Sequence, residues 1–209
     1  KELVENAIDA ESRRIAIEVQ GSGCRTIRVA DDGFGMEEDD VILALERHAT
    51  SKIEKDEDLA AIKTLGFRGE ALPSLAAVSR FELTSRTRDS TAGTQIFVSG
   101  GVVKKVSQCG CAPGTQVWVR DLFFNQPVRR KFLKTEKTEF GHVVDTLTRL
   151  ALSRPEVHFS LRLRDRQVHD WPGAVNLQQR LAQIFSRGFS QSWLPLSQKQ
   201  GSLVIEGYL

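Results

Sequence analysis

A carboxylate falls at an inward-facing position at the end of a predicted strand. Residues 26–30 alternate between polar and apolar side chains, so Ile27 and Val29 share a buried face, and period two places Asp31 on the same face. Burying a carboxylate without a donor costs several kcal/mol, so the fold must bring a hydrogen-bond donor to this position. A planar ligand with an exocyclic amine would supply one. The alternative is an ordinary Asp-Gly turn.

The start of the chain predicts a helix with one polar side. Wound at about 100° per residue, residues 1–10 separate into an apolar side and a narrow polar arc, which contains Glu2, Glu5, Asn6 and Asp9. Glu2 and Asn6 are one turn apart, so a carboxylate and a carboxamide point the same way. By itself this pattern is also typical of a surface helix with a solvated stripe. Residues 15–19 then alternate and predict a hairpin with residues 26–30.

Two motifs therefore follow one another, Glu-x-x-x-Asn on a helix and Asp-x-Gly-x-Gly after a strand (residues 31–35). Together they resemble the ATP site shared by gyrase, the Hsp90 chaperones, sensor histidine kinases and the MutL mismatch-repair proteins. Three further stretches, at residues 47–53, 66–72 and 121–133, resemble the MutL/Mlh/Pms family, and the resemblance runs through nearly the whole chain. A histidine kinase would not explain residues 66–72.

The resemblance implies a fold and a division of the chain. We expect a two-layer α/β sandwich of the Bergerat or GHKL type, in which helices cover one face of a mostly antiparallel mixed sheet. Residues 1–175 would form the ATPase domain. Residues 176–209 would hold a linker helix and the first strand of a second α/β domain, the transducer.

The resemblance also implies roles for individual side chains. Glu2 would be the general base that activates water for attack on the γ-phosphate of ATP, and Asn6 would offer an amide oxygen to Mg²⁺. Asp31 would accept a hydrogen bond from the adenine amine, beside Thr115. The remaining nucleotide contacts would come from residues near the base or the phosphates, namely Gly33, Gly35, Thr50, Ser51, Lys52, Arg68, Gly69, Glu70, Ala71 and Leu72.

Composition bounds these expectations. The chain has 209 residues, of which 40% are hydrophobic, enough for one well-packed core. Its net charge of +2 predicts no global attraction to nucleic acid. The three cysteines form no disulfide framework, and no apolar run approaches membrane-spanning length. Because the helical pattern already includes the first residue, we expect a fragment cut at both ends.

A local basic segment predicts a second kind of contact. On a helix that starts after Pro127, Arg130 and Lys134 would lie one turn apart, Lys137 would continue the row, and Arg129 would lie beside it. Such a row could bind DNA phosphates, or it could be a solvated face beside an apolar anchor.

For the intact protein, the resemblance implies slow ATP hydrolysis, lid closure over the nucleotide and pairing of two N-terminal domains, in a homodimer or a MutL-type heterodimer. It implies a MutS-type mismatch-recognition protein and downstream repair factors as partners. The setting would be the cytoplasm and nucleoid of a bacterium or the nucleus of a eukaryote. The alternative is a DNA- or protein-binding scaffold without ATP turnover.

Overall fold

The computed structural model describes residues 1–209 except residues 22, 47–68, 186–193, 202 and 209. The helices of the described part are α1 (Glu2–Asp9), α2 (Glu38–Leu43), α3 (Ala71–Ala77), α4 (Pro127–Lys131), α5 (Glu136–Ser153) and α6 (Leu177–Phe185). Its strands are β1 (Arg14–Gln20), β2 (Thr26–Asp31), β3 (Arg80–Arg86), β4 (Gly93–Ser99), β5 (Val102–Cys109), β6 (Gly114–Arg120), β7 (His158–Leu163), β8 (Arg166–Trp171), β9 (Pro195–Gln200) and β10 (Leu203–Tyr208). None of the described helices is long and apolar enough to cross a membrane.

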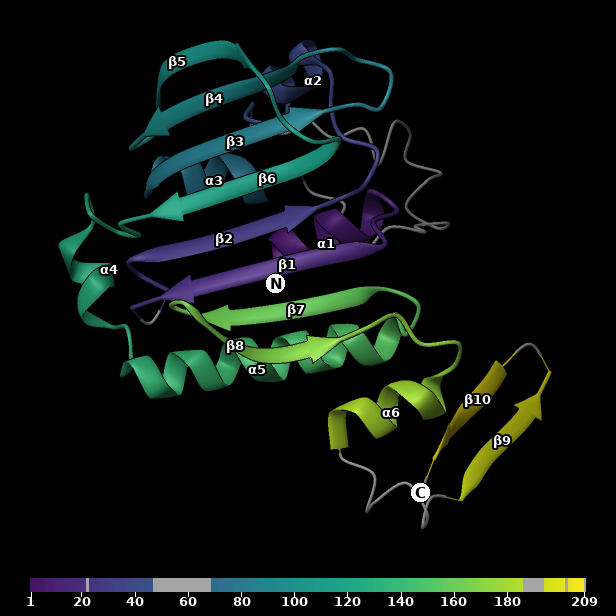
Figure 1. Ribbon diagram of the computed structural model, residues 1–209. Coiled ribbons are helices and arrows are strands. Elements are labelled where there is room, and N and C mark those ends of the chain that lie inside the picture. Colours follow the sequence, from purple (N-terminus) through teal and green to yellow (C-terminus); the bar gives the residue numbers. More distant parts are fainter. Residues whose placement is uncertain (22, 47–68, 186–193, 202, 209) are drawn as a thin grey trace.

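The main sheet is mixed and mostly antiparallel, as the sequence predicted. Among the described residues its strand order is β5-β4-β3-β6-β2-β1-β7-β8, in which β1 and β7 pair parallel and the other neighbours pair antiparallel. Figure 1 shows α1, α3 and α5 behind this sheet, so helices form one layer and strands the other. The expected two-layer α/β architecture is confirmed. Strand β7 pairs parallel with β1 and antiparallel with β8.

Alternation along the strands produces the core between the two layers. On β1, Ile15, Ile17 and Val19 are all buried, and they pack with the apolar side of α1 and with Leu147 and Leu150 of α5. A second buried cluster lies where α3 packs near β3, β4 and β6. The core therefore holds α1 rigidly against the strand ends nearest to it.

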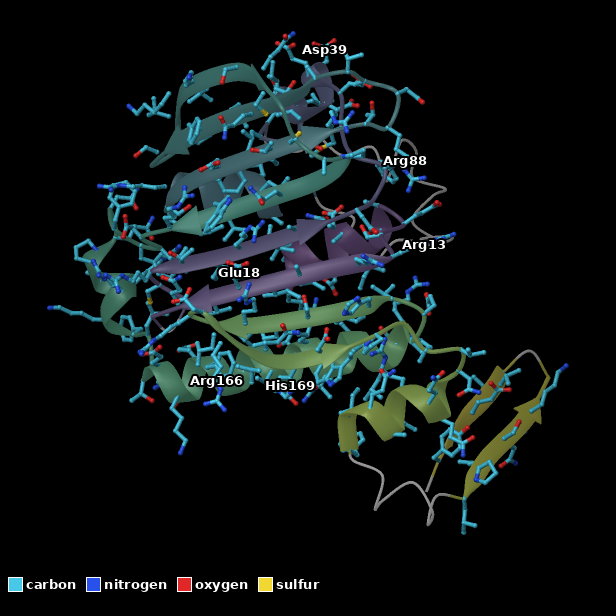
Figure 2. All side chains as sticks on the ribbon, viewed as in Figure 1. Arg13, Glu18, Asp39, Arg88, Arg166 and His169 are labelled. Carbon is cyan, nitrogen blue, oxygen red and sulfur yellow. The ribbon has the colours of Figure 1, made fainter. Side chains whose placement is uncertain are left out.

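The other face of the sheet carries polar side chains that pair across strands. Arg28 on β2 lies 2.6 Å from the Glu18 carboxylate on β1, and Figure 2 shows Glu18 on this face. Arg120 on β6 lies 2.7 Å from the Glu82 carboxylate on β3. Both guanidinium groups also lie over the Trp118 ring. Such cross-strand pairs stabilise the sheet where helices do not cover it.

Helix α6 is attached to the main sheet by a buried arginine. Arg180 has no exposed surface, and its guanidinium donates hydrogen bonds to the backbone carbonyls of Trp171, Pro155 and Val157. The following strands β9 and β10 form a separate antiparallel pair. The sequence predicted one strand in residues 176–209, whereas the part that the structure describes has two.

We expect Arg180→Ala to lower the free energy of unfolding by about 3 kcal/mol, because it leaves buried carbonyls without donors. Urea denaturation measures this. Arg149→Ala is the control, since Arg149 is exposed on α5 and pairs with Asp145 one turn away, a contact that contributes less than about 0.5 kcal/mol. Equal losses in the two variants would contradict the role of Arg180.

Candidate functional site

Three segments that are distant in the sequence meet at one end of the main sheet. Strand β2 ends at Asp31, which lies opposite Ile15 of β1. Strand β6, on the other side of β2, begins at Gly114 and places Thr115 next to Asp31. Helix α1 lies behind the same end of the sheet (Figure 1). The structure therefore brings together Asp31, Thr115 and α1, which the sequence assigned to one site.

The Asp31 carboxylate is held by donors from three directions. Its Oδ1 atom accepts from the Ser12 hydroxyl at 3.1 Å, the Gly33 N–H at 3.0 Å and the Thr115 N–H at 3.3 Å. Burial raises the pKa of Asp31, and these donors offset that shift only in part. The carboxylate is thus a fixed acceptor in a partly desolvated corner.

The glycines of the Asp-x-Gly-x-Gly motif allow distant backbone segments to pack closely against this loop. A Cβ on Gly33 would lie 2.5 Å from the Ala10 carbonyl oxygen, and one on Gly35 would lie 2.0 Å from the Arg86 carbonyl oxygen. Gly35 also has a φ of +73°, which favours glycine. Gly114, which the sequence analysis missed, packs equally closely on the Asp31 backbone. Within the described residues, the atoms that pack against these three glycines are mostly those of protein backbone.

Two side chains outside the predicted set complete the corner. The Asp32 carboxylate accepts from the Arg13 and Arg14 N–H groups, both at 2.8 Å, and so holds the start of β1. Ser85 on β3 has no exposed surface, and its hydroxyl contacts Thr115 Oγ1 at 2.9 Å. Asp31 was assigned to the site because it is a polar residue at an inward position of a strand. Ser85 is also a polar residue at an inward position, so the same reasoning would have identified it.

Helix α1 presents the predicted acid and amide on one side. Glu2 and Asn6 are one turn apart, and the Glu2 side chain is 55% exposed, with its carboxylate 3.6 Å from Lys1 Nζ. Glu5, predicted on the same solvated arc, is buried, because the turn packs against the core and Lys1 Nζ pairs with it at 3.1 Å. One amide oxygen is the kind of donor that Mg²⁺ takes from a protein when phosphates and water supply the others. The residues present fit such an ion.

The predicted phosphate contacts lie only partly in the described residues. Gly69, Glu70, Ala71 and Leu72 are described: Gly69 has a φ of +63°, Glu70 is the N-cap residue of α3, and the helix begins at Ala71. The other predicted contacts, Thr50, Ser51, Lys52 and Arg68, lie outside the described residues.

The basic segment does not form the single helical row that was predicted. Helix α4 ends at Lys131, and α5 begins after Thr135, whose hydroxyl caps it by accepting the Thr138 N–H. The interruption separates Arg130 from Lys134 and Lys137. The cations are nevertheless all exposed: Arg129, Arg130, Lys131, Lys134 and Lys137.

Comparison with known proteins agrees with this geometry. The family model described as histidine kinase-, DNA gyrase B-, and HSP90-like ATPase matches residues 1–109. The DNA mismatch repair protein MutL of Geobacter sp. (strain M21) is 51% identical over 207 residues, which are 99% of this chain and 32% of that protein. MutL of Symbiobacterium thermophilum is 50% identical over 209 residues, 100% of this chain and 33% of that protein. This chain thus spans about a third of the length of these relatives.

A solved structure gives the same result. The Aquifex aeolicus MutL ATPase domain complexed with ADP superimposes with a TM-score of 0.74 at 34% identity, covering 94% of this chain and 69% of that one. The chain belongs to the family of histidine kinase-, DNA gyrase B- and HSP90-like ATPases. Within that family it is a MutL-type ATPase domain.

The raised pKa of Asp31 predicts a pH dependence of stability. The folded carboxyl keeps its proton to higher pH than the unfolded one, so the folded state loses stability as pH rises from the ordinary value of 3.8 through the raised pKa. Without nucleotide, we expect Asp31→Asn to gain stability relative to the parent across that window. Urea unfolding from pH 4 upward measures this, with the exposed Asp145→Asn as the control for charge removal. The same pH profile in both variants would contradict it.

Proposed function

We propose that this chain binds ATP in the corner formed by α1, the end of β2 and the start of β6, and hydrolyses it slowly. The observation that carries the proposal is the Asp31 carboxylate, fixed by three donors beside Thr115 and next to α1. All three donors reach the Oδ1 atom, so Oδ2 is the carboxylate oxygen that could accept a hydrogen bond from a ligand. The ADP complex of the Aquifex aeolicus relative supports a nucleotide as that ligand.

Asp31 would select the base. Its carboxylate accepts a hydrogen bond from the 6-amine of adenine, whereas guanine has a carbonyl oxygen at the corresponding position and would face the carboxylate with a second acceptor. Gly114 supports this role, since it packs directly on the Asp31 backbone and limits its movement.

The exposed side of α1 would carry the chemistry. Glu2 orients a water molecule and takes its proton during attack on the γ-phosphate, and its exposed carboxylate is open to solvent as that role requires. Asn6 would hold Mg²⁺ through its amide oxygen, and the ion would supply positive charge to the phosphates. Gly69 to Leu72, with Arg68, Thr50, Ser51 and Lys52, would contact the phosphates.

In the longer protein, this domain would act as a nucleotide switch. We infer that ATP closes a lid and pairs two N-terminal domains, in a homodimer or a heterodimer, so that mismatch recognition by a MutS-type protein is coupled to downstream repair factors. The MutL relatives are named DNA mismatch repair proteins and come from bacteria, which supports that setting. The site of action would then be the cytoplasm and nucleoid.

We expect Glu2→Gln to lower the turnover number at least about 100-fold while the dissociation constant of ATP changes little, because a general base acts on the water and not on nucleotide binding. Single-turnover hydrolysis and calorimetric titration with Mg²⁺ measure the two quantities. Glu156→Gln, at an exposed carboxylate outside α1, is the control. Loss of ATP binding in a folded Glu2→Gln protein would refute the assignment.

A second candidate function is DNA binding by the basic segment, with or without ATP turnover. Figure 1 shows α4 at the opposite end of the sheet from α1. Its cations are exposed and lie next to the exposed Val128 and Phe132. They would bind backbone phosphates, and nucleotide would then not compete with DNA for the same surface.

We expect the double charge reversal Arg130→Glu/Lys134→Glu to reduce the slope of log affinity against log salt for duplex DNA by about two or more, because each contact to a phosphate contributes nearly one unit. Fluorescence anisotropy at several salt concentrations measures the slope. Reversal of Lys104 and Lys105, which are exposed on the edge strand β5, is the control. An unchanged slope would exclude Arg130 and Lys134 as phosphate contacts.

A further inference from the structure

Ser85 is a buried hydroxyl at the back of the proposed adenine corner. It lies on β3, directly opposite Thr115 of β6, and continues the inward series of Phe81 and Leu83. Its Oγ accepts the Met36 N–H at 2.9 Å and lies 3.1 Å from the Gly114 carbonyl oxygen, to which it can only donate. The third contact is the Thr115 hydroxyl at 2.9 Å, in which either oxygen could be the donor.

The proton count decides the direction of that third bond. A serine hydroxyl has one proton and two lone pairs. If Ser85 gives its proton to Gly114, it has lone pairs for both the Met36 N–H and the Thr115 hydroxyl, and every group around it is paired. If Ser85 instead donates to Thr115, the Gly114 carbonyl loses this donor. The first arrangement makes more hydrogen bonds in a buried place, where an unmade bond is costly.

The direction of this bond determines what Thr115 offers to a ligand. Because its proton points toward Ser85, the Thr115 oxygen keeps lone pairs for the corner that it shares with the Asp31 carboxylate. The polar side chains of the corner then present acceptors. The 6-amine of adenine carries two N–H groups and can satisfy both acceptors, whereas the 6-carbonyl of guanine can satisfy neither.

We propose that Ser85 is a positioning residue for base specificity, which orients the Thr115 hydroxyl as an acceptor and so makes the corner select adenine over guanine nucleotides. This inference rests on the proposed function, and it adds to that function a residue that does not itself touch the base. Removing the Ser85 hydroxyl frees the Thr115 proton to turn toward the ligand. Thr115 can then donate to the guanine carbonyl, so selectivity falls.

The test compares the affinities of each variant for ADP and GDP by calorimetric titration with Mg²⁺. We expect Ser85→Ala to reduce the preference for ADP over GDP on the order of ten-fold, which corresponds to one hydrogen bond gained or lost. Ser79→Ala is the matched control, because Ser79 is equally buried just before β3 and its hydroxyl donates to the Leu75 carbonyl, away from the corner. It should lose stability and keep the parent preference.

Two further variants keep the inference testable if Ser85→Ala does not fold. Ser85→Cys keeps the shape and replaces the hydroxyl with a weakly hydrogen-bonding thiol, so it should lower the preference in the same direction. In a Thr115→Val background, Ser85→Ala should change the preference no further, since Ser85 acts through the missing hydroxyl.

The results distinguish a failure of this inference from a failure of the proposed function. An unchanged ADP preference in Ser85→Ala and Ser85→Cys would overturn the inference, and so would an undiminished effect of Ser85→Ala in the Thr115→Val background. A parent protein that binds neither ADP nor ATP would instead overturn the proposed function.

Discussion

The placement of one carboxylate constrains the geometry of the whole site. Asp31 lies in a partly desolvated corner, and burial makes its charge costly unless donors reach it. The loop before β1 supplies the Ser12 hydroxyl, and the start of β6 supplies the Thr115 N–H. Each donor comes from a different segment. The position of Asp31 therefore requires the register of β1, β2 and β6 to be correct together.

Close backbone packing is the second condition for this corner. Gly33, Gly35 and Gly114 lie so near other backbone atoms that a Cβ on any of them would lie within 2.5 Å of a carbonyl oxygen. In the described structure, these glycines allow backbone segments to pack closely around the end of β2. Close packing limits the movement of the Asp31 carboxylate, and a preorganised acceptor loses less entropy when a ligand binds.

The sheet connects two regions of different character. One end carries the corner and α1, and the other end carries the exposed cations of α4 and the segment that follows. Between them the uncovered face is crossed by paired charges, in which Arg28 meets Glu18 and Arg120 meets Glu82. Because these charges are neutralised pairwise, the face adds little long-range field of its own.

Much of the fold could be predicted from the sequence, because alternation and helical periodicity are local. Period two placed Asp31 inward, and the polar arc of α1 set Glu2 and Asn6 side by side. Local pattern could not show that Thr135 would cap a new helix and interrupt the basic row. It also could not show that Ser85 lies opposite Thr115, or that Arg180 binds carbonyls from two separate segments. Those contacts depend on strand register and on packing between distant segments, which only the tertiary structure determines.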